Sequence, residues 1–460
     1  MKIVSKNWLC RNDIIFFLVV FLFRVTLELN YVFVISKMYL THDLLTWGVY
    51  KLEVVGYKYL LSWIINIFFI ILIQKFIIIN LRSSSEIILF ALFMMSFIPS
   101  ISLYGLANIS NQYLAYFLLF WLVLVFFTNI FRSSIQYDGI KNIMPDKNNK
   151  KLLILGLILI CISIICIYIY YNGFTINFTL NTEEQYKIRH AIYAQGENKL
   201  INYIRNWSMS IIIPLAAIIF ISKKKWLFVL FMVLLQVLLY GIDMQKMALL
   251  ILPASVFAYL FYKENMINLV PIILVLFNVL SFVEFYGLKS RFILNNLIIR
   301  LYYIPAILSN CYFEYIEETH YYVVPASSIF SRLGLIKDYH YNIGLSYMIG
   351  EKYFGTSDIS ANTGMFGSAY SYGIFGVILI PVIYALLFVI LDKVTKGLKI
   401  NIFISIILLE VYAITGVSIF VVLLPYGFII ALLILSVLKK NKGYFNPIKR
   451  KHKTLYVQKY

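Results

Sequence analysis

Charged residues are scarce in this chain. Asp, Glu, Lys and Arg make up 13% of its 460 residues, whereas about a quarter is usual in soluble domains, and hydrophobic residues reach 62%. The mean hydropathy is +0.84. Uncharged runs such as 152–171 and 373–391 are long enough to cross a bilayer, which takes about 20 apolar residues. The composition therefore excludes an ordinary soluble domain and predicts an integral, polytopic membrane protein.

Cysteines and common catalytic motifs are also few. Of the four cysteines, Cys161 and Cys166 share one apolar run and only Cys311 falls in a long predicted loop, so we expect no disulfide outside the membrane. No Cys/His spacing typical of a metal site occurs. The sequence has no P-loop, no GxSxG, no HExxH and no DxD in a predicted outer loop. An ATP-driven pump is thereby excluded, and a metal-dependent nucleotide-sugar transferase is disfavoured.

Positive charge exceeds negative charge, with 40 Lys and Arg against 21 Asp and Glu. These residues stand in short clusters between apolar runs, such as 222–226, and in the tail 439–460. That distribution is typical of basic cytoplasmic loops and of a tail held near anionic lipid, so we expect no nucleic-acid partner.

The apolar runs predict about twelve spans in a single all-α membrane domain, residues 1–460, with a retained first span in place of a cleaved signal peptide. The predicted spans lie at 13–35, 59–80, 87–105, 112–131, 152–171, 206–222, 226–241, 247–262, 267–286, 371–391, 400–415 and 418–438. The seventh, eighth and eleventh of these spans are short.

Alternate connections between these spans are basic, which predicts that both termini are cytoplasmic. Two of the remaining connections are long, 172–205 and 287–370, and we expect both to be periplasmic loops. Loops of this length are usually functional. The larger one contains an apolar, helix-compatible piece, 291–308, that is expected to lie along the membrane surface.

Arginines in the predicted outer loops oppose the usual charge bias, so they require another explanation. Arg189, Arg291, Arg300 and Arg332 suit bidentate contacts to phosphates, although pairing with the loops' own glutamates is an equal alternative. Arg291 and Arg300 are nine residues apart, about 2.5 turns of an ideal α-helix, which puts them on different faces.

Tyrosines follow these arginines closely. Their rings suit stacking on sugars, but they equally suit an interfacial aromatic belt. They are Tyr302, Tyr303, Tyr312 and Tyr315.

Three further groups are candidates for chemistry or close packing. Asp243 and Lys246 have the i,i+3 spacing of a helical pair, at an outer turn or at the mouth of a cavity. His340, two residues after Asp338, is the preferred general base, with a surface histidine as the alternative. Glycines between 364 and 376 predict a close approach by a helix or a lipid-like substrate.

Together these features resemble the O-antigen polymerase (Wzy-type) family. The resemblance rests on about twelve spans with both termini inside, two large outer loops with arginines, the hairpin "GIDMQKMALL" (241–250), and "NTGMFGSAYSYGIFGVILIPVIYALL" (362–387). Some members place an arginine and a glycine ten residues apart in each outer loop. Here Arg189 is followed by Gly196 and Arg332 by Gly344, a departure from that spacing.

The resemblance implies a fold of the GT-C-like type and a glycosyltransferase of the inner membrane. Such enzymes join oligosaccharide repeat units carried on undecaprenyl pyrophosphate, with no metal or nucleotide cofactor. The expected partner is a co-polymerase that regulates chain length. His340 and Asp338 would then be catalytic. The positions expected to hold the pyrophosphate are Arg189, Lys246, Arg291, Arg300 and Arg332.

Two other functions remain open from the sequence. An O-antigen ligase has the same architecture and differs in its acceptor. A lipid-linked oligosaccharide flippase should carry charges inside its spans and have short outer loops, whereas we expect clean spans and long loops here.

Overall fold

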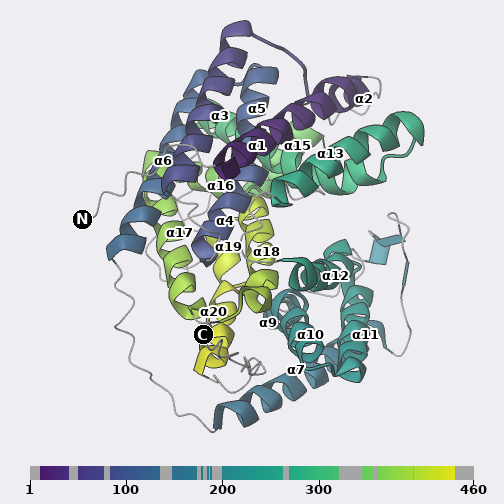
Figure 1. Cartoon of the computed structure of the whole chain (residues 1–460). Helices are drawn as coiled ribbons and strands as arrows, with labels where there is room; N and C mark the ends of the chain where they lie inside the picture. The colour runs from purple at the N-terminus through teal and green to yellow at the C-terminus, as the bar shows by residue number, and fades with distance from the viewer. Residues whose placement is uncertain are drawn as a thin grey trace, which may run out of the picture.

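The computed structural model describes most of the chain as helices (Figure 1). The described residues are 11–40, 50–76, 83–134, 148–173, 178–179, 184–185, 187–188, 199–262, 269–320, 344–355, 361–396 and 398–440. Within these ranges the only extended pairing is an isolated parallel bridge between Glu53 and Ala107. The predicted all-α class is confirmed for the described part of the chain.

The helices before residue 135 interrupt their α-helical turns twice with π-helical segments, in which each N–H bonds five residues back. They are α1 (Arg11–Asn30), η1 (Tyr31–Ile35), α2 (Ser36–Leu40), α3 (Gly56–Phe76), α4 (Ser84–Leu92), η2 (Phe93–Phe97), α5 (Ile98–Leu106) and α6 (Asn111–Ser134).

The central helices include a third π-helical segment, η3. They are α7 (Asn148–Asn172), α9 (Lys199–Trp207), η3 (Ser208–Ile212), α10 (Ile213–Ser222), α11 (Trp226–Asp243), α12 (Lys246–Phe261) and α13 (Leu269–Gly287). The last part of the chain adds a longer π-helical segment, η4. Its helices are η4 (Leu294–Tyr303), α14 (Ile304–Thr319), α15 (Leu345–Phe354), α16 (Met365–Tyr370), α17 (Gly373–Thr395), α18 (Ile400–Gly416), α19 (Ile419–Leu423) and α20 (Phe428–Lys440).

Eight of the helical stretches in the described residues are long and apolar enough to cross a membrane. They coincide with eight of the predicted spans. The other four predicted spans are present as shorter apolar helices, 156–171, 226–242, 248–261 and 400–416. The chain is therefore a membrane-embedded helical protein, and three of its four shorter helices are those that the sequence already showed to be short.

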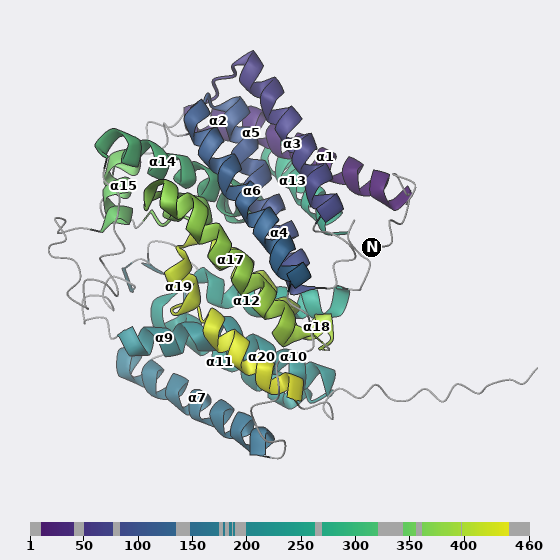
Figure 2. The ribbon, with the colours of Figure 1, turned by 90° about the vertical axis from the view of Figure 1, so that its left-hand side faces the viewer.

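The helices pack as two groups, each with an apolar core of its own (Figures 1 and 2). The larger group contains α1–α6 and α13–α20. The smaller contains α7, α9, η3, α10, α11 and α12, and Leu409 of α18 belongs to its core. Helix α18 lies between the groups, since it packs against α10, α12 and η3 as well as against α4.

Connections that are distant in sequence meet at one end of the larger group, which we call the loop end. The Glu53 N–H donates to the Leu106 carbonyl at 2.8 Å, and Lys58 Nζ donates to Asn108 Oδ1 at 2.7 Å. There too, the Tyr113 hydroxyl donates to Ser309 Oγ at 3.2 Å. Apart from Tyr113, which begins a predicted span, these residues belong to connections predicted to lie outside.

Polar contacts also gather at the other end, which we call the basic end. The Ser85 N–H and hydroxyl both donate to the Asp392 carboxylate, at 2.7 and 2.5 Å. Arg132 bonds Glu86 at 2.5 Å. These residues flank connections predicted to lie inside, so the described connections of the larger group that are named here lie at opposite ends according to their predicted class.

A buried ion pair joins the first two spans. Arg24 is fully buried, and its guanidinium donates to Glu28 Oε1 at 2.8 Å and to the Ser62 carbonyl and hydroxyl at 2.8 and 2.6 Å. The Trp63 ring lies 4.0 Å from it, and the Tyr59 hydroxyl donates to the second Glu28 oxygen at 3.0 Å. The expectation of charge-free spans was therefore wrong, because these charges are satisfied inside the protein and never face lipid.

We expect Arg24→Met to destabilise the protein strongly, because it leaves the Glu28 carboxylate buried without its cation. Loss of one partner of a buried pair costs about 3–5 kcal/mol. Thermal unfolding of the purified protein, followed by size exclusion, measures the effect. The double variant Arg24→Met with Glu28→Gln should recover part of the loss. Equal stability of Arg24→Met and wild type would show that the pair contributes nothing.

The loop end is predicted to face the periplasm and the basic end the cytoplasm, which gives a testable orientation of the chain in the membrane. Alkaline phosphatase fused at Gly196 or Tyr341 should be active outside the cytoplasm, whereas a fusion at Lys224 should be inactive. A cytoplasmic reporter fused at the same positions should show the opposite pattern. Activity of the phosphatase at Lys224 alone would reverse the orientation and would place the loop end in the cytoplasm.

Candidate functional site

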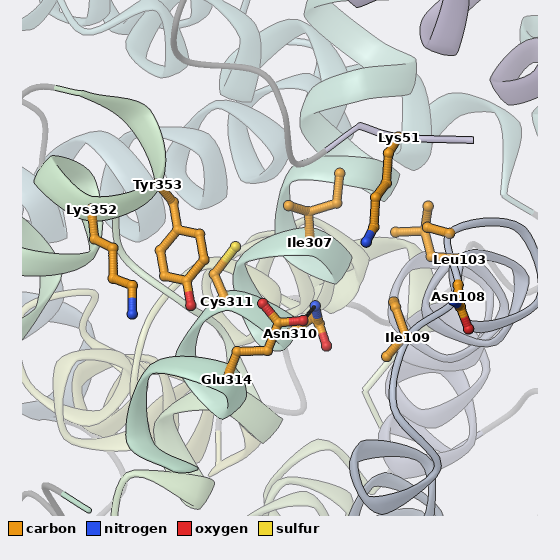
Figure 3. A pocket seen from close by; sticks show the side chains of 11 residues that line it. Lys51, Leu103, Asn108, Ile109, Ile307, Asn310, Cys311, Glu314, Lys352 and Tyr353 are labelled. Atoms are coloured by element: carbon orange, nitrogen blue, oxygen red, sulfur yellow. Dashed lines mark hydrogen bonds between the residues drawn. The ribbon is translucent and has the colours of Figure 1, made fainter. Parts of the chain in front are cut away.

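A cavity of about 320 Å³ opens at the loop end (Figure 3). Its volume lies at the lower end of the range of small-molecule sites. Its apolar wall consists of Leu103, Ala107, Ile109, Ile307 and Cys311. Its polar groups are Lys51, Asn108, Asn310, Glu314, Lys352 and Tyr353. We refer to it as the loop-end pocket.

The connection between α5 and α6 supplies one side of this pocket. Asn108 adopts a left-handed conformation with φ of 54°, which asparagine tolerates better than most residues. The buried Lys58 ammonium donates to Asn108 Oδ1 and to the Ile109 carbonyl, at 2.7 and 2.8 Å. Asn108 in turn donates to Glu53 at 2.7 Å, which ties the first connection to the same wall.

Helix α14 supplies the opposite side and is anchored along its length. Pro305 stands in its first turn, where a missing N–H costs nothing. The Tyr312 hydroxyl donates to the Ala361 carbonyl at 3.0 Å. Glu317 accepts from Gln112 at 2.8 Å and from the Tyr370 hydroxyl, so this carboxylate links α14 to α6 and α16.

Helix α15 closes the pocket next to α14. It ends at Gly355, whose φ of 68° is the left-handed conformation that commonly terminates a helix. Lys352 forms an ion pair with Glu318 of α14, and its ammonium lies 5.3 Å from the Tyr315 ring and 5.5 Å from the Tyr353 ring. Lys352 and Tyr353 are thereby held at the rim.

Burial controls the protonation of two groups in the pocket. Burial raises the pKa of Tyr353, and the nearby Cys311, Glu314 and Glu318 raise it further. Burial also raises the pKa of the Cys311 thiol, with a further contribution from Glu314. Both groups are therefore neutral near pH 7, which makes Tyr353 a hydrogen-bond donor and Cys311 a poor nucleophile.

The carboxylates around the pocket differ in their partners. The pKa of the exposed Glu53 is lowered by the hydrogen bond from Asn108 and by Lys51, with which it pairs at 3.4 Å. Glu318 pairs with Lys352. Glu314 is exposed and accepts from Asn310 Nδ2 at 2.9 Å, with no ion-pair partner among the described residues.

Most of the predicted site residues cannot be compared with this pocket. Arg189, Arg332, Asp338 and His340 lie outside the described residues. Of Lys246 only the backbone is described, and it begins α12. The helical pairing expected with Asp243 is wrong, because α11 ends at Asp243 and Met244 adopts a left-handed φ of 54° between the two helices.

Arg291 and Arg300 are exposed but do not line the pocket. Arg291 lies 5.7 Å from the Phe285 ring, and Arg300 acts electrostatically on Tyr412 of α18. Arg300 precedes Glu314 by fourteen residues, about 20 Å along a helix. Arg291 and Arg300 were predicted to lie on different faces of an ideal α-helix, whereas Leu294–Tyr303 is π-helical and has a wider turn.

The four tyrosines after Arg300 are core residues, so neither a sugar platform nor an interfacial belt describes them. Tyr302 and Tyr303 pack against α1, where the Tyr303 hydroxyl donates to the Leu27 carbonyl at 2.7 Å. Tyr312 and Tyr315 are also buried. The predicted helix at 291–308 thus directs its apolar side into the protein core.

The sequence did not identify the residues that the pocket brings together. Lys51 and Asn108 lie in short connections that contain no motif. Glu314 was one of several acids in the long loop, and Lys352 one of several bases. Only the length of the connection 287–370 pointed toward this region.

The predicted close approach at the glycines is confirmed as contact between helices. A Cβ on Gly364 would lie 2.1 Å from the Thr415 carbonyl oxygen at the end of α18. A Cβ on Gly367 would lie 3.2 Å from the Ser309 Cα of α14, and closer still to the Thr363 side chain. The absence of a side chain at these glycines therefore lets α16 pack closely between α14 and α18.

Gly364→Ala should destabilise the protein, because the new methyl group meets backbone that cannot move easily. Overpacking of this kind costs about 1–3 kcal/mol. Gly416→Ala is the matched control, since its Cβ would meet nothing within 4 Å. The unfolding temperatures of both purified variants test the difference, and a Gly364→Ala protein as stable as Gly416→Ala would contradict the packing described above.

Comparisons with known proteins add no relative: no family model, no curated protein and no solved structure matches the chain. No group of three or more His, Cys, Asp or Glu side chains suitable for a metal occurs in the described part of the molecule.

Proposed function

We propose that the protein polymerises oligosaccharide repeat units carried on undecaprenyl pyrophosphate, at the outer face of the inner membrane. One observation carries the proposal. Connections that the charge pattern predicts to be outside converge at one end of a helical membrane protein and enclose a polar pocket there. A substrate with a membrane-bound tail and a sugar head needs a site at such a boundary.

The reaction would move the growing chain from its carrier onto the next unit and release lipid pyrophosphate. That leaving group is already activated, so cationic side chains can stabilise its charge without a metal. Arg291 and Arg300 are exposed and have no acidic partner among the described residues, as a phosphate contact requires. Arg189, Arg332 and Lys246 are proposed for the same role, and His340 with Asp338 for proton transfer.

The remaining features of the proposal follow from the same resemblance to O-antigen polymerases. The fold would be of the GT-C-like type with twelve spans, and both termini would be cytoplasmic. The reaction would need no cofactor. A chain-length-regulating co-polymerase and membrane lipid would be its partners.

Charge inside the spans does not favour the flippase alternative. A transport path needs groups that exchange partners with a passing substrate. Arg24 instead has three hydrogen bonds to α1 and α3 and a ring beside it, so it acts as a fixed link between the helices. An O-antigen ligase differs from the polymerase only in its acceptor, so an assay of the products is needed to distinguish the two.

The decisive experiment supplies the purified protein, in lipid nanodiscs, with lipid-linked repeat units extracted from cells that make them. A ladder of products together with released undecaprenyl pyrophosphate supports the polymerase. Transfer to added lipid A core without a ladder would instead identify a ligase. Unchanged lipid-linked units would overturn both enzymatic functions.

Arg300→Ala should reduce polymer formation about tenfold or more while protein level is kept. Loss of a charge-assisted contact costs about 1.5–3 kcal/mol. Asn295→Ala, also exposed on η4, is the matched control. Arg300→Lys separates bidentate contact from charge alone. Normal ladders from Arg300→Ala would remove this residue from the substrate site.

A further inference from the structure

Glu314 differs from the other carboxylates around the loop-end pocket. Glu53 and Glu318 are each paired with a lysine, and Glu317 is held between two helices by Gln112 and Tyr370. Glu314 lines the pocket, and only its Oε1 is engaged, by the Asn310 amide at 2.9 Å. Its Oε2 has no partner among the described residues, so it is available to a ligand.

The charges around the pocket balance, which bears on the kind of ligand it takes. Three lysines, Lys51, Lys58 and Lys352, stand against the three carboxylates Glu53, Glu314 and Glu318, and each lysine already has a polar partner. A pyrophosphate would need an excess of positive charge. Carboxylate, amide and phenol groups with an apolar wall suit a neutral sugar, whose hydroxyl groups both donate and accept.

The position of the pocket also separates it from the arginines. Glu314 lies on the continuous helical rod of η4 and α14, about 20 Å from Arg300. One substrate can therefore occupy both places only if a short oligosaccharide extends between them. An acceptor unit has this form, since its lipid pyrophosphate is at one end and its attacking hydroxyl is on the terminal sugar at the other. Arg300 would then hold the pyrophosphate of the acceptor, and the leaving pyrophosphate of the donor would be stabilised by the other proposed cations, Arg189 and Arg332.

We propose that the loop-end pocket holds the terminal, non-reducing sugar of the acceptor, and that Glu314, in place of His340 and Asp338, takes the proton from its attacking hydroxyl. This inference rests on the proposed polymerase function. The acceptor oxygen forms a bond to the anomeric carbon of the donor chain, and the bond from that carbon to the pyrophosphate oxygen breaks. The electron pair leaves with the pyrophosphate, and the proton moves to Glu314 Oε2.

The arrangement around Glu314 fits this task. Asn310 fixes one carboxylate oxygen and so orients the other toward the cavity (Figure 3). Tyr353 stays protonated, so it can donate a hydrogen bond to a neighbouring sugar oxygen. Lys51 projects into the same space from the first connection.

The test compares Glu314→Gln with Glu351→Gln in the nanodisc assay. Glu351 is an exposed carboxylate on α15 that does not line the pocket. We expect Glu314→Gln to lower the rate of extension by about 100-fold or more, the usual contribution of a general base. Glu351→Gln should retain the wild-type rate. Formate added to Glu314→Ala should restore part of the activity, an effect that a purely structural role would not produce.

The outcomes separate this inference from the function on which it rests. Failure of the wild-type protein to extend any unit overturns the proposed function. Extension by wild type and by Glu314→Gln at equal rates overturns only the role of Glu314. Loss of extension in His340→Ala together with full activity in Glu314→Gln would assign the proton to His340 instead. If formate does not restore activity to a folded Glu314→Ala protein, Glu314 is not the general base.

Discussion

The absence of water inside a bilayer governs this structure. Backbone N–H and C=O groups within the hydrocarbon region must find partners in their own segment, which leaves helices as the arrangement for a chain this apolar. Polar connections are then confined to the two ends, and chemistry can take place only where several of them meet. The buried contacts of Arg24, Ser62 and Glu28 show the same constraint applied to side chains, since each charge is satisfied before it reaches lipid.

The spans could be predicted because each is a local, one-dimensional signal of apolar residues. Features that depend on neighbours could not. The sequence around Tyr302 and Tyr303 does not show whether these rings face a sugar, lipid or the protein core. Their packing against the first helix places them in the core. Helical spacing also failed where the backbone leaves the α conformation, at the break around Met244 and in the π-helical η4.

The loop-end pocket could not be predicted for a related reason. Its polar groups come from three connections, and the two extremes, Lys51 and Lys352, are 301 residues apart in the sequence. None of these groups belongs to a recognisable motif. What the charge pattern did predict was that these connections share one side. The arginines and His340, chosen for their chemistry alone, remain predictions, because most of them lie outside the described residues.

The arrangement of the helices in two groups has a mechanical consequence. The smaller group has a core of its own and meets the larger one mainly along α18, through α10, α12 and η3, where Ile211 and Leu215 belong to the core of the larger group. If the proposed function holds, the polyprenyl tail of the substrate would reach the protein from the side, within the bilayer. Any adjustment between the groups during that entry would turn about α18, while the loop-end pocket, built wholly on the larger group, would keep its shape.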